Sequence, residues 1–146
     1  MKITGSYQVP VADQERVYRA LQDPQVLSRC IPGCEGLELA GVDEYSMKMK
    51  MALAAVSGQF AGKVKIAERA PSTSFRLTVE GTGKIGFVKG SGLLTLKPAP
   101  AAVDVEYDGD LQIGGTIAAV GQRLMDTTSK MMIKRFFDKF AGELMG

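Results

Sequence analysis

The sequence contains no histidine and no tryptophan among its 146 residues, and only two cysteines. Histidine is the side chain whose unperturbed pKa lies closest to neutral pH, so Ser, Cys and metal-assisted mechanisms lose their usual general base. A tetrahedral zinc site takes four Cys, His or carboxylate ligands, and two cysteines cannot complete one without two carboxylates. We therefore expect neither a metal nor another cofactor.

Long apolar runs and a strong net charge are also missing. No run reaches the ~18 residues needed to cross a bilayer, and the N-terminal segment MKITGSYQV lacks the apolar core of a secretory signal. The 18 basic and 16 acidic side chains leave a net charge of +2, so no global field favours nucleic acid. We expect one cytoplasmic domain spanning residues 1–146, large enough to bury a sizeable core.

The apolar pattern predicts an α+β protein. Residues 2–9 alternate as a first strand, and two short helices follow, one capped by Asp13 and one ended by the Ile31-Pro32-Gly33 turn. Residues 34–114 keep a period of two, typical of about six antiparallel strands with one wet face. Residues 116–145 lack proline and space their apolar residues as one long helix, with Thr116 as the expected N-cap.

This order of elements resembles the helix-grip fold of the START and Bet v 1-like (SRPBCC) superfamily, in which a curved antiparallel sheet of about seven strands wraps around a long C-terminal helix. More narrowly, the segments LSRCIPGCEGL, GQFAGKVKI, GFVKGSGLLTL and GGTIAAVGQRLMD resemble those of the CoxG-like family of carbon monoxide dehydrogenase subunits. The resemblance covers essentially the whole chain. It implies a cavity for a hydrophobic ligand, with quinone handling or membrane recruitment of a molybdenum-containing dehydrogenase as the role.

The alternating apolar faces supply candidates for the lining of such a cavity. In a helix-grip fold the space between sheet and helix is often hollow, and flexible thioethers suit a pocket for a variable apolar molecule. The ordinary alternative is a filled core, because methionine also fills gaps well. The candidate lining residues are Met47, Met49, Met51, Leu53, Phe60, Phe75, Leu77, Phe87, Leu94, Tyr107, Leu111, Leu124, Met125 and Met131.

Both cysteines flank the Ile-Pro-Gly turn and could form a redox pair, a catalytic thiol or structural core residues. A catalytic thiol needs a histidine, a cation or a helix N-terminus, yet Cys30 lies at the opposite end of its helix beside Arg29 alone. We favour two small apolar residues in a reduced cytoplasm. On this interpretation Cys30, Pro32, Gly33 and Cys34 form the rim of the cavity.

Two charged segments have ordinary explanations. Asp104, Glu106, Asp108 and Asp110 occupy alternate positions, so they share one strand face, and a row of like charges is tolerated where water screens it. The segment KMMIKRFFDKF combines basic and apolar residues, which either complement the helix dipole and the core or lie peripherally on the inner face of a membrane. Since Phe136 and Phe137 are adjacent, we expect one of them to be exposed to a partner or a membrane.

Two classes of function follow. The first is a non-enzymatic carrier of a hydrophobic small molecule, an accessory factor to the dehydrogenase that the resemblance implies. The second is a small helix-grip enzyme, cyclase- or hydrolase-like, acting on an apolar substrate. A catalytic cavity should present several inward polar groups, and the predicted inner faces offer little beyond Tyr45 and Tyr107, which favours the carrier. We do not expect nucleotide binding, because the glycines of GTGKIGFVKGSG do not have phosphate-loop spacing.

Overall fold

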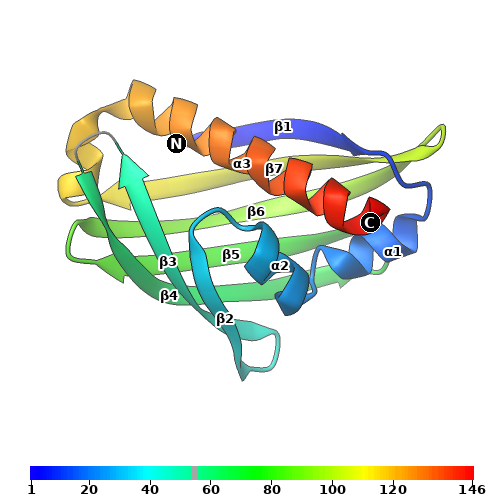
Figure 1. The fold of residues 1–146 in the computed structure, drawn as a ribbon, viewed down its shortest axis with the longest axis horizontal. Helices are drawn as coiled ribbons and strands as arrows, with labels where there is room; N and C mark the ends of the chain where they lie inside the picture. Colours follow the sequence, from blue (N-terminus) through cyan, green and yellow to red (C-terminus); the bar gives the residue numbers. More distant parts are fainter. Residues whose placement is uncertain (54–55) are drawn as a thin grey trace.

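A computed structural model of the protein describes residues 1–53 and 56–146, without the side chains of Leu53 and Val56. The chain forms one seven-stranded antiparallel sheet, with a long helix across one face and two short helices toward one end (Figure 1). In their order across the sheet the strands are β1 (Lys2–Val9), β7 (Ala102–Gly114), β6 (Gly86–Ala99), β5 (Ser74–Gly83), β4 (Val56–Ala70), β3 (Glu44–Leu53) and β2 (Cys34–Gly41). The first strand therefore lies beside the last, and β2 forms the other edge. The predicted α+β class and the helix-grip arrangement are confirmed.

The strands fall where the period of two predicts them. In β1 and β7, for example, Val9 lies opposite Val103 and both are fully buried.

The helices differ from the prediction at one point. The Asp13 side chain accepts a hydrogen bond of 3.1 Å from the Arg16 amide, as expected of an N-cap. The single helix expected from Thr116 is wrong, because Gly121 has a φ of 98° and divides the segment in two. The helices are α1 (Gln14–Ala20), α2 (Pro24–Cys30), the 3-10 helix η1 (Thr116–Val120) and α3 (Gln122–Met145).

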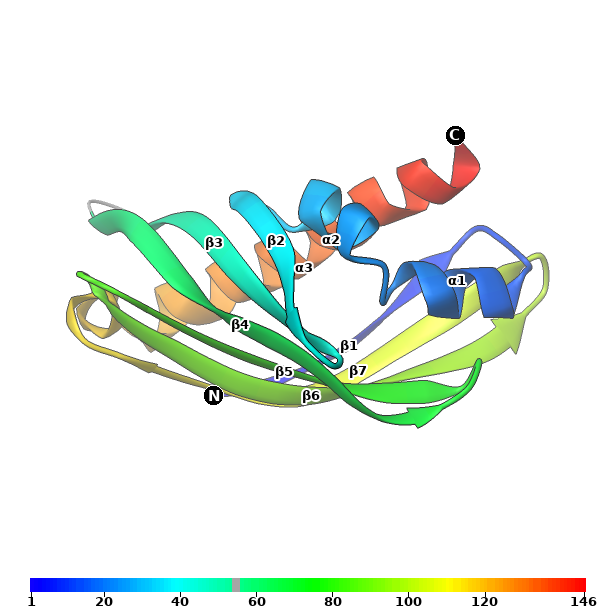
Figure 2. The same cartoon turned by 90° about the horizontal axis from the view of Figure 1, so that it is seen from below.

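The sheet is strongly curved, and its concave face lies toward α3 (Figure 2). Gly62 on β4 shows how the bend depends on sequence. A Cβ atom at this position would overlap the carbonyl oxygen of Glu80 on β5, so the two backbones approach more closely than any side chain would allow. The curvature forms a trough along which α3 can lie.

Two packed clusters lie at opposite ends of this trough. The large cluster contains the ends of β1 and β7 near Val9 and Val103, together with Phe137 and Phe140 of α3. The small cluster is built around Phe60 and Ile117. Between them, inner-face positions of the central strands are occupied by glycine, and the interior there is hollow.

Candidate functional site

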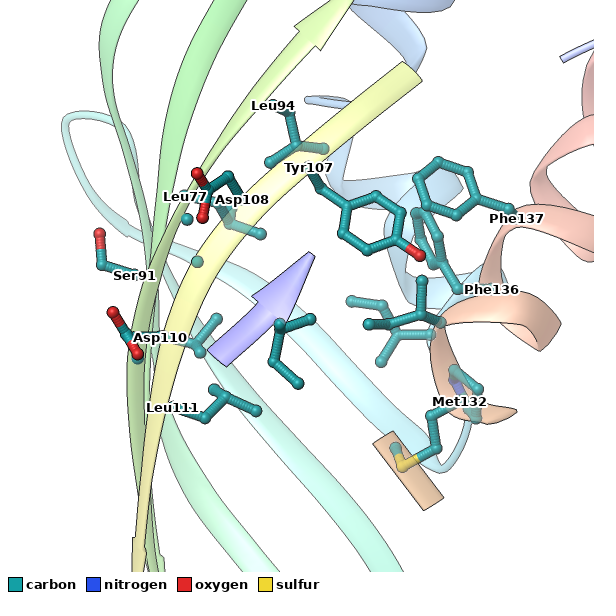
Figure 3. Close-up of a pocket in the computed structure, with 18 residues that line it drawn as sticks. Leu77, Ser91, Leu94, Tyr107, Asp108, Asp110, Leu111, Met132, Phe136 and Phe137 are labelled. Carbon is teal, nitrogen blue, oxygen red and sulfur yellow. The ribbon is translucent and has the colours of Figure 1, made fainter. Parts of the chain in front are cut away.

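The first hollow, here called the glycine chamber, has a volume of about 300 Å³. Its floor includes Gly90, Gly92 and Gly109, which add no side chain to the inner face of β6 and β7. Figure 3 shows Met132 and Phe136 of α3 facing this floor. The other apolar residues around it are Ile3, Ile31, Pro32, Leu77, Val79, Leu94, Leu111, Ile133 and Phe137.

The second hollow, here called the methionine chamber, has a volume of about 290 Å³. Met47, Met49 and Met51 lie along one face of β3 and form one of its walls, as alternation along a strand requires. The remaining apolar lining consists of Leu21, Leu27, Ile31, Phe60, Val64, Leu77, Val79, Gly81, Val88 and Phe136.

The two chambers share a wall of four apolar side chains. Leu77 and Val79 of β5 form its lower part, and Ile31 and Phe136 belong to the elements above the sheet. The Phe136 ring stacks on Phe140, with ring centroids 5.8 Å apart. Side chains, and not backbone segments, therefore separate the two chambers.

Within the described residues, few polar residues border the chambers: Ser91, Tyr107, Asp108 and Asp110 in the glycine chamber and Glu80 in the methionine chamber. Ser91 and Asp110 border the glycine chamber through their backbones, since Figure 3 shows their side chains on the far side of the sheet. Tyr107 differs, because its ring lies on the inner side, stacked against Phe137 at 5.9 Å. Among the described residues, no group forms a hydrogen bond with the Tyr107 hydroxyl, and burial raises its pKa. Tyr107 is the residue that brings a hydroxyl group to the lining of the glycine chamber, with its oxygen beside Gly5 of β1.

Other tyrosine hydroxyls have partners outside the cavity. Tyr7 donates to the Asp138 carboxylate at 2.7 Å, and Tyr18 donates to the Ser74 carbonyl at 2.9 Å. The bond to Asp138, helped by burial, raises the pKa of Tyr7 to about 12. In contrast with Tyr107, these two hydroxyls hold the helices on the sheet.

The corner between α2 and β2 carries part of the cavity roof. The Cys34 amide donates to the Ile31 carbonyl at 3.1 Å, and Gly33 has a φ of 79°, which matches a type II β-turn with proline and glycine at its centre. The Gly33 carbonyl accepts the Lys50 amide of β3 at 2.8 Å. The corner is thus fixed to the sheet while Ile31 and Pro32 line the chambers.

The two cysteines have free thiols and different surroundings. Cys30 is 2% exposed within the large cluster, and burial raises its pKa. Cys34 is half-buried, with its sulfur 3.6 Å from the Gly36 carbonyl oxygen. Neither lines a chamber. Both border an outer groove beside α3, together with Pro32 and Gly33. Of these four rim candidates, Pro32 also lines the glycine chamber.

The structure brings eight of the candidate lining residues together around the chambers. They are Met47, Met49, Met51, Phe60, Leu77, Leu94, Tyr107 and Leu111. Phe75 also faces inward but is 1% exposed in the large cluster, edge-on to Tyr18. Leu124 packs on the small cluster, and Met125 is partly buried on α3 outside both chamber linings. The Leu53 side chain lies outside the described residues.

Two of the candidates point the other way. Phe87 is 38% exposed, because Val88 and not Phe87 has the inward position on β6. Met131 is 44% exposed, because Met132 and Phe136, one turn apart on α3, form its inward face and Met131 lies beside that face. The expectation that one phenylalanine of the pair faces outward is also wrong: Phe137 is buried and Phe136 lies in the shared wall.

Sequence reasoning missed Ile31, Met132, Phe136 and the floor glycines. A single signal pointed to some of them, since glycines at 90 and 92 alternate in step with Leu94 and therefore share its face. Ile31 lies in a turn, where no periodic pattern assigns a direction to its side chain.

The charged rows lie on the outer surface, as expected. Asp108 and Asp110 are exposed, and Lys2 of β1 lies 3.4 Å and 3.8 Å from their carboxylates. On α3, Lys134 pairs with Asp138 at 2.7 Å, which with the Tyr7 hydrogen bond lowers the pKa of this carboxyl group. No helix in the described residues is both long enough and apolar enough to span a bilayer.

Comparison with known proteins defines the family. Residues 5–145 match the model of CoxG, a subunit of carbon monoxide dehydrogenase. The chain belongs to the CoxG family. A conserved protein from Geobacillus kaustophilus is similar to it over 98% of this chain and 94% of its own, with 33% identity and a TM-score of 0.93. No match was found among the curated proteins.

More distant structures share the fold of this CoxG-family chain. Ara h 8.0201 has 13% identity and a TM-score of 0.67, covering 99% of this chain and 97% of its own. The Zhui aromatase/cyclase from a Streptomyces species has 12% identity and a TM-score of 0.66, covering 98% of this chain and 92% of its own. At such identities the similarity establishes the Bet v 1-like helix-grip fold alone.

Proposed function

We propose that this protein binds a hydrophobic small molecule, such as a quinone or a lipid, between its sheet and α3. The observation that carries this proposal is a pair of chambers walled by apolar side chains, one of which, the glycine chamber, is also lined by Tyr107. Sites for small molecules are typically concave and apolar, with a few polar groups that fix orientation. Membership of the CoxG family supports an accessory role beside a molybdenum-containing dehydrogenase of the carbon monoxide dehydrogenase type.

Binding is favoured over catalysis by the chemistry of the lining. Acid–base catalysis needs positioned groups whose pKa values lie near the working pH. Tyr107 is the titratable side chain that faces the chambers in the described part of the chain, and burial moves its pKa further above neutrality. A tyrosine of this kind can orient a ligand but is a poor proton carrier at pH 7.

The proposal is tested by comparing two isosteric substitutions. Val79→Thr places a hydroxyl in the wall shared by the chambers, whereas Val42→Thr changes a side chain that is 91% exposed at the β2–β3 turn. A buried hydroxyl without a partner costs ~1 kcal/mol or more, so the affinity for a fluorescent fatty-acid analogue should fall about fivefold in Val79→Thr only.

Native mass spectrometry of the purified wild-type protein provides an independent measurement. We expect one apolar molecule per chain, released on activation, and saturable binding of the fluorescent analogue with the same stoichiometry. A wild-type protein that carries no such molecule and does not bind the analogue would contradict the proposed function.

A further inference from the structure

The division of the cavity limits the shape of its ligand. Each chamber alone lies at the lower limit of the ~300–1,000 Å³ found for small-molecule sites, whereas the two together lie well within that range. The chambers adjoin across the sheet at β5, and the side chains that line both of them are Ile31, Leu77, Val79 and Phe136.

Resting on the proposed function, we propose that one elongated apolar chain occupies both chambers and that Phe136 sets the chain length accepted. Leu77 and Val79 are fixed in the middle of β5, and Ile31 is fixed by the turn whose Gly33 carbonyl binds Lys50. Phe136 instead projects from a helix, and a rotamer change moves its ring without moving the backbone. It is therefore the part of the wall that can open.

Each chamber also contains a glycine that can be used to block it. A Cβ atom at Gly92 would find its nearest neighbours at 3.5 Å, and one at Gly81 at 3.7 Å, both ordinary contacts. Gly92 lines the glycine chamber alone, and Gly81 lines the methionine chamber alone. Valine at either position suits a strand and extends into the corresponding chamber.

The experiment measures displacement of a fluorescent fatty-acid analogue by octanoate and by palmitate. If one chain spans both chambers, Gly92→Val and Gly81→Val should each weaken palmitate binding at least tenfold, which corresponds to ~1.4 kcal/mol. Octanoate, which is short enough for one chamber, should be weakened by only one of them. Gly36→Val is the matched control, since no atom lies within 4 Å of a Cβ there.

Palmitate binding that is lost in only one blocked variant would overturn the two-chamber proposal and assign a compact ligand to that chamber. This result differs from failure of the proposed function, in which the wild-type protein binds neither fatty acid.

A second variant tests the role of Phe136 directly. Phe136→Leu shortens the side chain in the shared wall, so the affinity for palmitate relative to octanoate should rise about fivefold. Phe87→Leu makes the same change on the outer face and should leave the ratio unaltered. An unchanged ratio in a folded Phe136→Leu protein would show that this ring does not set the chain length.

Discussion

Gly62 and Gly81 face each other on neighbouring strands of the curved sheet, and we predict that adding a side chain at position 62 destabilises the fold. A methyl group at position 62 would overlap the Glu80 carbonyl oxygen and lie 2.6 Å from the Cα of Gly81. Strands β4 and β5 would have to separate by roughly 1 Å, which weakens two or three ladder hydrogen bonds worth ~1 kcal/mol each. Gly62→Ala should therefore lower the free energy of unfolding by ~3 kcal/mol.

The partner glycine provides the control. At position 81 the methyl group has room, and the reduced entropy of the unfolded chain should stabilise Gly81→Ala by up to ~0.5 kcal/mol. Urea denaturation followed by circular dichroism measures both effects. For a chain of this length ~3 kcal/mol corresponds to a decrease of ~6–12 °C in melting temperature. Equal midpoints for the two variants would refute the reasoning, because the backbones would then be free to move apart.

Three further predictions concern individual side chains. Tyr107→Phe should leave the melting temperature unchanged but lower the affinity for a ligand with a hydrogen-bond acceptor about tenfold, as measured by isothermal titration. An equal decrease in affinity for a pure hydrocarbon would contradict this prediction. The pKa of Tyr7 is raised to about 12, so its bond to Asp138 stabilises the fold below pH ~10, and this contribution disappears as the pH rises to about 12. In an ultraviolet titration one tyrosine should ionise at a lower pH in Asp138→Asn than in the wild-type protein, and identical titration curves for the two proteins would exclude the bond. Because burial raises the pKa of Cys30, a thiol reagent should label Cys34 first in the native protein, and equal labelling rates would indicate that the corner opens.

The sequence predicted the strands and their faces well, because one face of the sheet is wet and the other buried. Met47, Met49 and Met51 alternate with lysines and alanine, so only one assignment keeps the charges in water. The same rule placed the carboxylates of β7 outside. It failed at Phe87, since the neighbouring residues of that segment are largely glycines, which carry no hydropathy signal for either face.

The helix and the cavity could be predicted less well. A stripe drawn from Ile117 through Leu124 to Met131 assumes one continuous helix, and the φ of Gly121 interrupts it. Within α3 the neighbouring stripe, which includes Met132 and Phe136, lines the chamber, so Met131 was assigned to the wrong face of the helix. The chambers are divided by side chains from a turn, a strand and a helix that lie far apart in the sequence. No local sequence pattern predicts that these side chains come into contact.

The hollow between the two packed clusters also gives the protein a distinctive response to pressure. Empty internal volume is eliminated when a chain unfolds, so unfolding of the unliganded protein should be accompanied by a volume decrease toward the large end of the ~20–100 mL/mol range. A ligand that fills both chambers removes that empty volume, and one that fills a single chamber leaves part of it. The volume change of unfolding, measured under pressure, would therefore show how much of the cavity a ligand fills, even before the ligand is identified.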